Sequence, residues 1–124
     1  MITARPLIDA NSVNSFEFAQ QFDLTEGDAA DLYFQLTQVP SGIRFMPAVG
    51  ALLSATINHL DDAKKVTRSC TQPFAQDPSI WKLQVLATDY VKGTLDLKLT
   101  LTEGVVVTHC NLRNIIRVKA PTSF

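Results

Sequence analysis

Two histidines and a few hydroxyl and thiol side chains are the residues with which this sequence could perform nucleophilic chemistry. The histidines are His59 and His109, and the candidate nucleophiles are Ser54, Ser69 and Cys70. A hydrolase triad places a histidine between a nucleophile and an orienting acid. No serine lies in a Gly-x-Ser-x-Gly turn, the motif that exposes a nucleophilic serine in many hydrolases. We therefore predict that the protein is not an enzyme.

The acidic residues form two groups that are candidates for a metal site. Segment 59–62 reads His-Leu-Asp-Asp, and Asp23, Glu26 and Asp28 form a second small group. A metal site needs three or four converging ligands, and a calcium loop needs a denser and longer pattern of them. Aspartate is a common turn residue, so both groups are typical of solvated turns. We expect no metal and no other cofactor.

The basic residues form two local groups in a chain whose net charge is -1. No aromatic residues alternate with them to stack on bases, and the five scattered glycines form no phosphate-binding loop. A broad basic face for nucleic acid is therefore not expected. The groups are Lys64, Lys65 and Arg68, which read as a solvated strand edge, and Arg113, Arg117 and Lys119, which could line one strand face.

The 124 residues suffice for one domain, and 46% of them are hydrophobic. No apolar run approaches the roughly 18 residues of a membrane helix. Pro6 and Asp9 interrupt the apolar stretch that a secretory signal would require. We expect no membrane partner. Cys70 and Cys110 make neither a disulfide framework nor a zinc spacing, and we expect two buried thiols, with a single bridge left open.

Alternation of apolar and polar residues with a period of two dominates the chain. Leu95, Leu97, Leu99 and Leu101 alternate with polar residues, which places all four on one face only in a strand. Turn and loop signals separate such segments, for example Gly27 in the turn 25–28. The other predicted strands cover 16–22, 32–37, 53–58, 64–68, 81–85, 105–110 and 115–118, with 111–114 as a possible break.

This spacing of strands predicts an all-β, antiparallel sandwich of about seven to eight strands, with a barrel as the alternative. The domain is expected at 16–120, between an N-terminal arm at 1–15 and a tail at 121–124. Loops are expected at 43–47 and at 72–79, where two prolines cannot join a central ladder.

Several of these segments resemble a known family. Segment 24–28, Leu-Thr-Glu-Gly-Asp, followed by the alternating segment 31–36, is similar to the opening of small immunoglobulin-like modules of tailed-phage virions, such as those of the upper baseplate. Segment 93–104 resembles their closing strand and turn, and 112–118 their last strand. The resemblance spans about residues 16–118.

The resemblance implies an immunoglobulin-like sandwich without catalytic residues. It implies a virion structural protein of a tailed bacteriophage, assembled in the host cytoplasm and present in many copies that contact other virion proteins. A tail or baseplate component is preferred, and a capsid decoration (cement) protein is the alternative. No small-molecule substrate is implied.

Large apolar residues that no predicted strand face buries are candidate partner contacts, because exposed apolar side chains mark interaction sites. Phe45 and Phe74 have the alternative of filling the ends of the sandwich. The candidates are Ile2, Leu7, Ile8, Phe45, Met46, Phe74 and Phe124.

A carbohydrate-binding module is an alternative of a different class. Tyr33, Tyr90 and Trp81 would form its sugar platform. However, Trp81 shares its parity with Leu83 and Val85, which predicts that it points inward.

Overall fold

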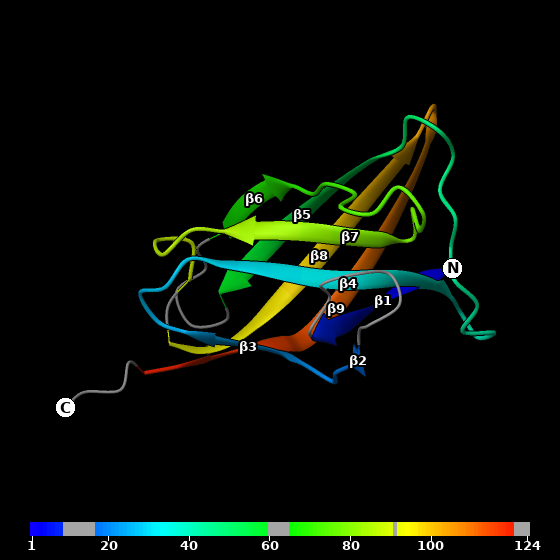
Figure 1. Ribbon diagram of the computed structural model, residues 1–124. Coiled ribbons are helices and arrows are strands. Elements are labelled where there is room, and N and C mark those ends of the chain that lie inside the picture. The colour runs from blue at the N-terminus through cyan, green and yellow to red at the C-terminus, as the bar shows by residue number, and fades with distance from the viewer. Residues whose placement is uncertain (9–16, 60–64, 91, 121–124) are drawn as a thin grey trace.

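The computed structural model describes residues 1–8, 17–59, 65–90 and 92–120, and within these ranges it contains strands and no helix. The strands form two sheets that pack face to face in a sandwich-like arrangement (Figure 1). No described helix could cross a membrane. The strands are β1 (Ile2–Ile8), β2 (Glu17–Phe18), β3 (Phe22–Thr25), β4 (Ala30–Gln38), β5 (Leu52–His59), β6 (Lys65–Ser69), β7 (Ile80–Val85), β8 (Gly93–Glu103) and β9 (Val106–Lys119).

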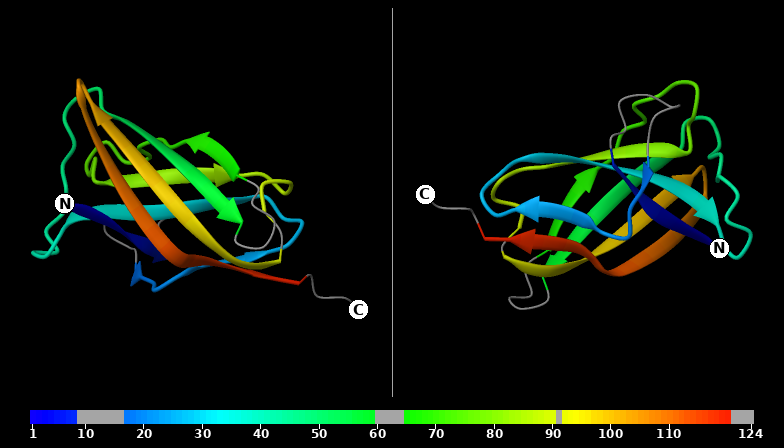
Figure 2. Two further views of the ribbon diagram at one scale, coloured as in Figure 1. Left: turned by 180° about the vertical axis from the view of Figure 1, so that it is seen from behind. Right: turned by 60° about the horizontal axis from the view of Figure 1, so that its bottom comes forward.

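The first sheet has the order β2-β1-β4-β7 and the second the order β3-β9-β8-β5-β6. In Figure 1, β1, β4 and β7 run across the diagonal strands β5, β8 and β9 behind them. Every pairing is antiparallel except that of β3 with β9, where Phe22 lies opposite Ile116 and Leu24 opposite Val118. Figure 2 shows β3 beside the C-terminal half of β9 from two further sides.

The core lies between the sheets and contains the residues that the period-two pattern assigned to it. The four leucines of β8 are buried, as are Leu53, Ala55 and Ile57 on β5. Their polar neighbours in sequence point outward, because successive side chains of a strand face opposite sides of the sheet. From β4, Phe34 meets Phe22 edge to face, with ring centroids 6.4 Å apart.

The expected N-terminal arm is wrong for residues 2–8, which form the inner strand β1 of the first sheet. The backbone amide of Ala19 donates to the carbonyl of Pro6 at 2.9 Å. Since N and O of one strand residue point to the same side, the missing donor of Pro6 faces the β2 side and costs the β1–β4 ladder no hydrogen bond. Residues 9–15 lie outside the described part of the chain.

The described residues form nine strands, more than the seven to eight expected. Besides β1, the extra strand arises because the predicted strand 16–22 is divided into β2 and β3, which belong to different sheets. Phe18 of β2 is partly exposed and lies under the guanidinium of Arg5, 3.7 Å from the ring centroid, whereas Phe22 of β3 enters the core. The period-two pattern of Phe16, Phe18 and Phe22 continues past the point where the chain leaves the first sheet for the second, so the pattern did not reveal this change.

The possible break at 111–114 is a bulge inside one long strand. On β8, Leu97 lies opposite Leu112 and Leu95 opposite Ile116, so β9 carries two extra residues at this point. Asn114 has a φ of 53°, and its amide donates to the Asp96 carboxylate at 2.7 Å. Its carbonyl accepts the Gln21 side-chain amide at 2.9 Å. Asparagine tolerates this left-handed conformation better than most residues.

The basic group at 64–68 is not wholly a solvated edge. Arg68 turns to the buried Asp89 and makes two hydrogen bonds, at 2.6 and 3.0 Å. This partner raises the pKa of Arg68. Asp89 also accepts the backbone amide of Leu86 at 2.8 Å. The pair therefore fixes the turn after β7 against β6. Lys65 is exposed, and Lys64 lies outside the described residues.

Candidate binding surfaces

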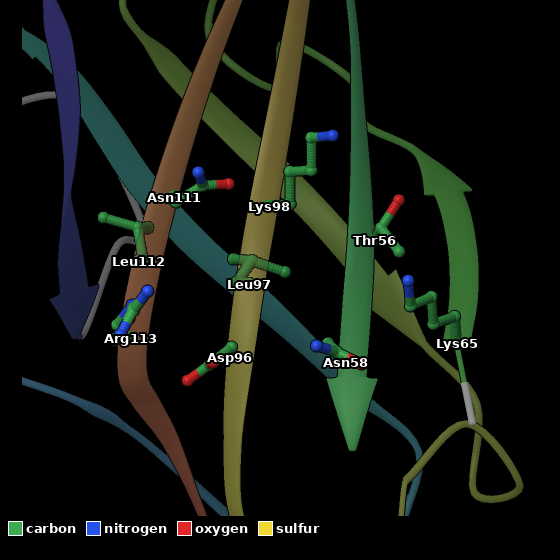
Figure 3. Close-up of a pocket in the computed structure, with 9 residues that line it drawn as sticks. All are labelled: Thr56, Asn58, Lys65, Asp96, Leu97, Lys98, Asn111, Leu112 and Arg113. Atoms are coloured by element: carbon green, nitrogen blue, oxygen red, sulfur yellow. The ribbon is translucent and has the colours of Figure 1, made fainter. Parts of the chain in front are cut away.

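The outward side of the second sheet carries a shallow hollow of about 210 Å³, which we call the polar hollow. Its side chains come from four adjacent strands, β6, β5, β8 and β9, at the level of the bulge (Figure 3). The polar residues that line it are Thr56, Asn58, Lys65, Asp96, Lys98, Asn111 and Arg113. The alternation that buries the leucines of β8 places Asp96 and Lys98 here.

The charge of the polar hollow is positive, with three cationic side chains and one carboxylate. Lys65, Lys98 and Arg113 are exposed, and within the described part of the chain none of them forms a salt bridge. Asp96 is half-buried, and one of its oxygens accepts the amide of Asn114. The hollow can therefore attract an anion, although the whole chain has a net charge of -1.

The structure brings three of the predicted chemical residues into one row on the same face. Ser54 lies opposite Ser69 on β6 and opposite Thr100 on β8, and Thr100 lies opposite His109 on β9. The hydroxyl of Thr100 is 3.2 Å from Nδ1 of His109. This bond occupies the ring nitrogen that an orienting carboxylate would hold in a triad. Ser69, Ser54, Thr100 and His109 therefore form a row of hydrogen-bonding side chains on the outer face of the second sheet. The side chain of His59 and residues 60–62 lie outside the described residues.

The two cysteines are free and buried, as expected for small core thiols. Burial raises the pKa of Cys70 to about 12 and also raises the pKa of Cys110. Because only the thiolate is strongly nucleophilic, Cys70 is inert near neutral pH. No cluster of three or more potential metal ligands occurs among the described residues.

A second surface, which we call the apolar end, lies where the β8–β9 turn meets the loop before β5 (Figures 1 and 2). The loop is tied to β8 by the amide of Ala48, which donates to the Glu103 carboxylate at 2.8 Å. Across the strands, Leu52 lies opposite Thr102, and Thr102 opposite Val107. The exposed aliphatic side chains of this end are Val49, Leu52, Val105, Val106 and Val107.

Most of the residues predicted to contact a partner are buried in the structure or pack against the core. Ile2 and Leu7 are buried in β1 and are therefore not available to a partner. Phe45 packs against the main core, and Phe74 packs on the smaller cluster of Leu7 and Ile80, so both fill gaps at the margin of the core. Ile8 and Met46 are exposed. Phe124 lies outside the described residues.

The aromatic platform of the carbohydrate alternative is not present at the surface. Trp81 and Tyr90 are buried, and Tyr90 donates its hydroxyl to the carbonyl of Thr25 at 3.0 Å. Tyr33 is half-buried beside Phe74 and Leu7. The inward direction that parity predicted for Trp81 is confirmed.

The sequence contained a signal for both surfaces that the prediction did not use. Three successive valines directly after the Glu-Gly turn cannot all face the core, because a strand alternates its faces. Asp96 and Lys98 are two of the polar residues that alternate with the leucines of β8, so their outward direction follows from that pattern. Their neighbours on β5 and β9 depend on the register between strands, which one sequence does not state.

The fold and these surfaces define an all-β, sandwich-like protein with one polar, cationic hollow and one exposed apolar end. No protein-family model matches the chain, and no curated protein matches its sequence.

Proposed function

We propose that this protein is a non-enzymatic structural protein of a tailed-phage virion, a tail or baseplate component, and that its apolar end packs against a second copy of the chain. The apolar end carries the proposal. Its side chains Val49, Leu52, Val105, Val106 and Val107 have exposed fractions of 106, 71, 99, 57 and 52%, together about four fully exposed aliphatic side chains.

The amount of apolar surface suits self-association. Burying an aliphatic side chain contributes roughly 1.5–3 kcal/mol, so two copies bring roughly 12–24 kcal/mol of potential gain. Association costs roughly 4–15 kcal/mol in lost freedom. With half of the surface covered, the gain of roughly 6–12 kcal/mol lies within the range of this cost, as expected for a weak and reversible oligomer.

The strand order supports the immunoglobulin-like part of the proposal. In such domains strands A, B and E are neighbours in one sheet, and C, F and G in the other. The orders β1-β4-β7 and β5-β8-β9 correspond to these two sets. The apolar end then comprises parts of the B–C and F–G loops and the strand ends beside them, and these loops form part of the recognition end in variable domains. This correspondence is an analogy of fold, and the exposed valines supply the physical reason for binding.

The test is the oligomeric mass of the purified chain, measured by light scattering over a concentration series. We expect a defined oligomer that dissociates on dilution. Val105→Asp places a charge at a side chain that is 99% exposed. The protein concentration at which half of the oligomer has dissociated should rise at least about tenfold. The matched control, Ala120→Asp, adds the same charge directly after the far end of β9 and should leave the midpoint unchanged.

A wild-type chain that stays monomeric throughout, or a Val105→Asp variant that associates like the wild type, would contradict the self-association. The virion part is tested separately. We expect the protein in purified particles of the phage that encodes it, at a fixed copy number that resists a salt wash. Its absence from such particles would overturn this part.

A further inference from the structure

The arginines of this protein are nearly all engaged, and the exception lies in the polar hollow. Their partners are carboxylates for Arg44, Arg68 and Arg117, and the ring of Phe18 for Arg5. Arg113 is the one arginine for which the described part of the chain supplies neither. Its guanidinium is a rigid fork of donors that matches two oxygens of a carboxylate, sulfate or phosphate.

The strand register places a second cation on the strand beside Arg113. Lys98 lies opposite Asn111, two residues before Arg113 on β9. In Figure 3 the ammonium of Lys98 points away from Arg113, so Lys98 adds positive charge to the hollow from the neighbouring strand. Lys65 closes the hollow on the β6 side, opposite Asn58. Among the described residues that line the hollow, three cations and the carboxylate of Asp96 give a net charge of +2.

The remaining side chains that line the hollow are three neutral hydrogen-bonding groups and two leucines, Leu97 and Leu112. The amides of Asn58 and Asn111 each provide donors and an acceptor, and the hydroxyl of Thr56, which is 2.9 Å from that of Thr67, lies beside them. The amides and the hydroxyl suit the hydroxyls of a ligand, and the leucines suit the carbon atoms of a sugar ring. The volume of about 210 Å³ is small and open, which limits the bound part to about one ring with its anionic substituent.

We propose that the polar hollow binds an acidic saccharide. Its oxyanion is held by Arg113, Lys98 adds to the positive potential, and its hydroxyls are held by Asn58, Asn111 and Thr56. Nucleic acid is the less suitable polyanion, because no aromatic side chain lines the hollow to stack on a base. The proposal is independent of the self-association proposed above, since the apolar end contributes no residue to the hollow.

The experiment is a titration of the full ¹⁵N-labelled chain by NMR, with sodium glucuronate as the probe. We expect saturable shifts of the amides of residues 96–98 and 111–114. Arg113→Gln should weaken binding about fivefold, as expected for the loss of an exposed charge pair. Lys119→Gln removes a positive charge further along β9, outside the hollow, and should leave the affinity within about twofold of the wild type.

Three further probes separate the sources of the same chemistry. Acetate carries the carboxylate alone, glucose the hydroxyls alone, and inorganic phosphate a free oxyanion. All three should bind more weakly than glucuronate. If acetate or phosphate binds as tightly as glucuronate, the saccharide is not recognised and this part of the proposal is overturned. If glucose binds as tightly as glucuronate, the oxyanion is not recognised and that part is overturned. The absence of saturable shifts, or an unchanged affinity in Arg113→Gln, would overturn the site.

Discussion

Truncation of Leu7 tests whether the first residues are part of the core. Leu7 and Ile8 are neighbours on β1, but their exposed fractions are 4% and 45%. Leu7 packs with Ile80, Tyr33 and Phe74 in a cluster separate from the main core. Leu7→Ala should therefore destabilise the fold strongly, whereas Ile8→Ala removes a side chain that is largely in water and provides the matched control.

The magnitude follows from burial and from the size of the cluster. Buried leucine-to-alanine changes cost about 2–5 kcal/mol, and a small cluster that can partly collapse belongs in the lower half of this range. We expect a loss of about 2–3 kcal/mol, or about 8–12 °C in Tm for a chain of this length. Ile8→Ala should cost less than about 1 kcal/mol, as is usual for an exposed position.

The assay is urea unfolding followed by the fluorescence of Trp81, in which the midpoint should fall and the slope should stay constant. Equal midpoints for Leu7→Ala, Ile8→Ala and the wild type would refute the reasoning. That result would mean that residues 2–8 form an arm outside the core. The same logic predicts that removal of the whole strand unfolds the domain, because it would uncover the edge of β4 along Phe34 and Leu36.

Two further predictions concern buried side chains. A thiol reagent at pH 8 should label Cys70 and Cys110 quickly in urea and barely in the native protein, because burial raises the pKa of both thiols, that of Cys70 to about 12. Unfolded thiols ionise near pH 8.5, whereas the folded Cys70 keeps its proton, so the free energy of unfolding should fall as pH rises from about 9 towards 12. The fall should be smaller in Cys70→Ala. A free energy of unfolding that does not change with pH in this range would contradict the prediction. Trp81 should emit as a buried indole and resist quenching by iodide, with the urea-unfolded chain as control; strong native quenching would mean that its side chain is exposed.

The sequence predicted strands best where one face of the strand is buried and the other is exposed to solvent. The four leucines of β8 alternate with polar residues over eight positions, and all four are buried as expected. The turn at Gly27, with a φ of 93°, was also predictable, because glycine adopts this conformation freely. In these places the local pattern and the tertiary environment agree, so local reasoning is sufficient.

Prediction failed where the pairing partner decides the structure. Residues 1–15 were expected to form an arm, but residues 2–8 form β1, in which the missing donor of Pro6 lies towards the short β2. The continuous alternation from 16 to 22 hid a change of sheet. Arg68 was grouped with its basic neighbours in sequence, yet its partner Asp89 lies 21 residues away. Such long-range partners leave no periodic trace in a single sequence.

The bulge in β9 explains how one strand can serve two surfaces and still close the sandwich. Before the bulge, β9 follows β8 and contributes Val106 and Val107 to the apolar end and Asn111 to the polar hollow. The two extra residues bend the strand, since a bulge strengthens the local twist. Beyond them, Ile116 and Val118 return to the core and pair in parallel with β3. Asp96 and Gln21 hold the bulged backbone by its amide and carbonyl at Asn114, so Arg113 is presented from a fixed point rather than from a loose loop.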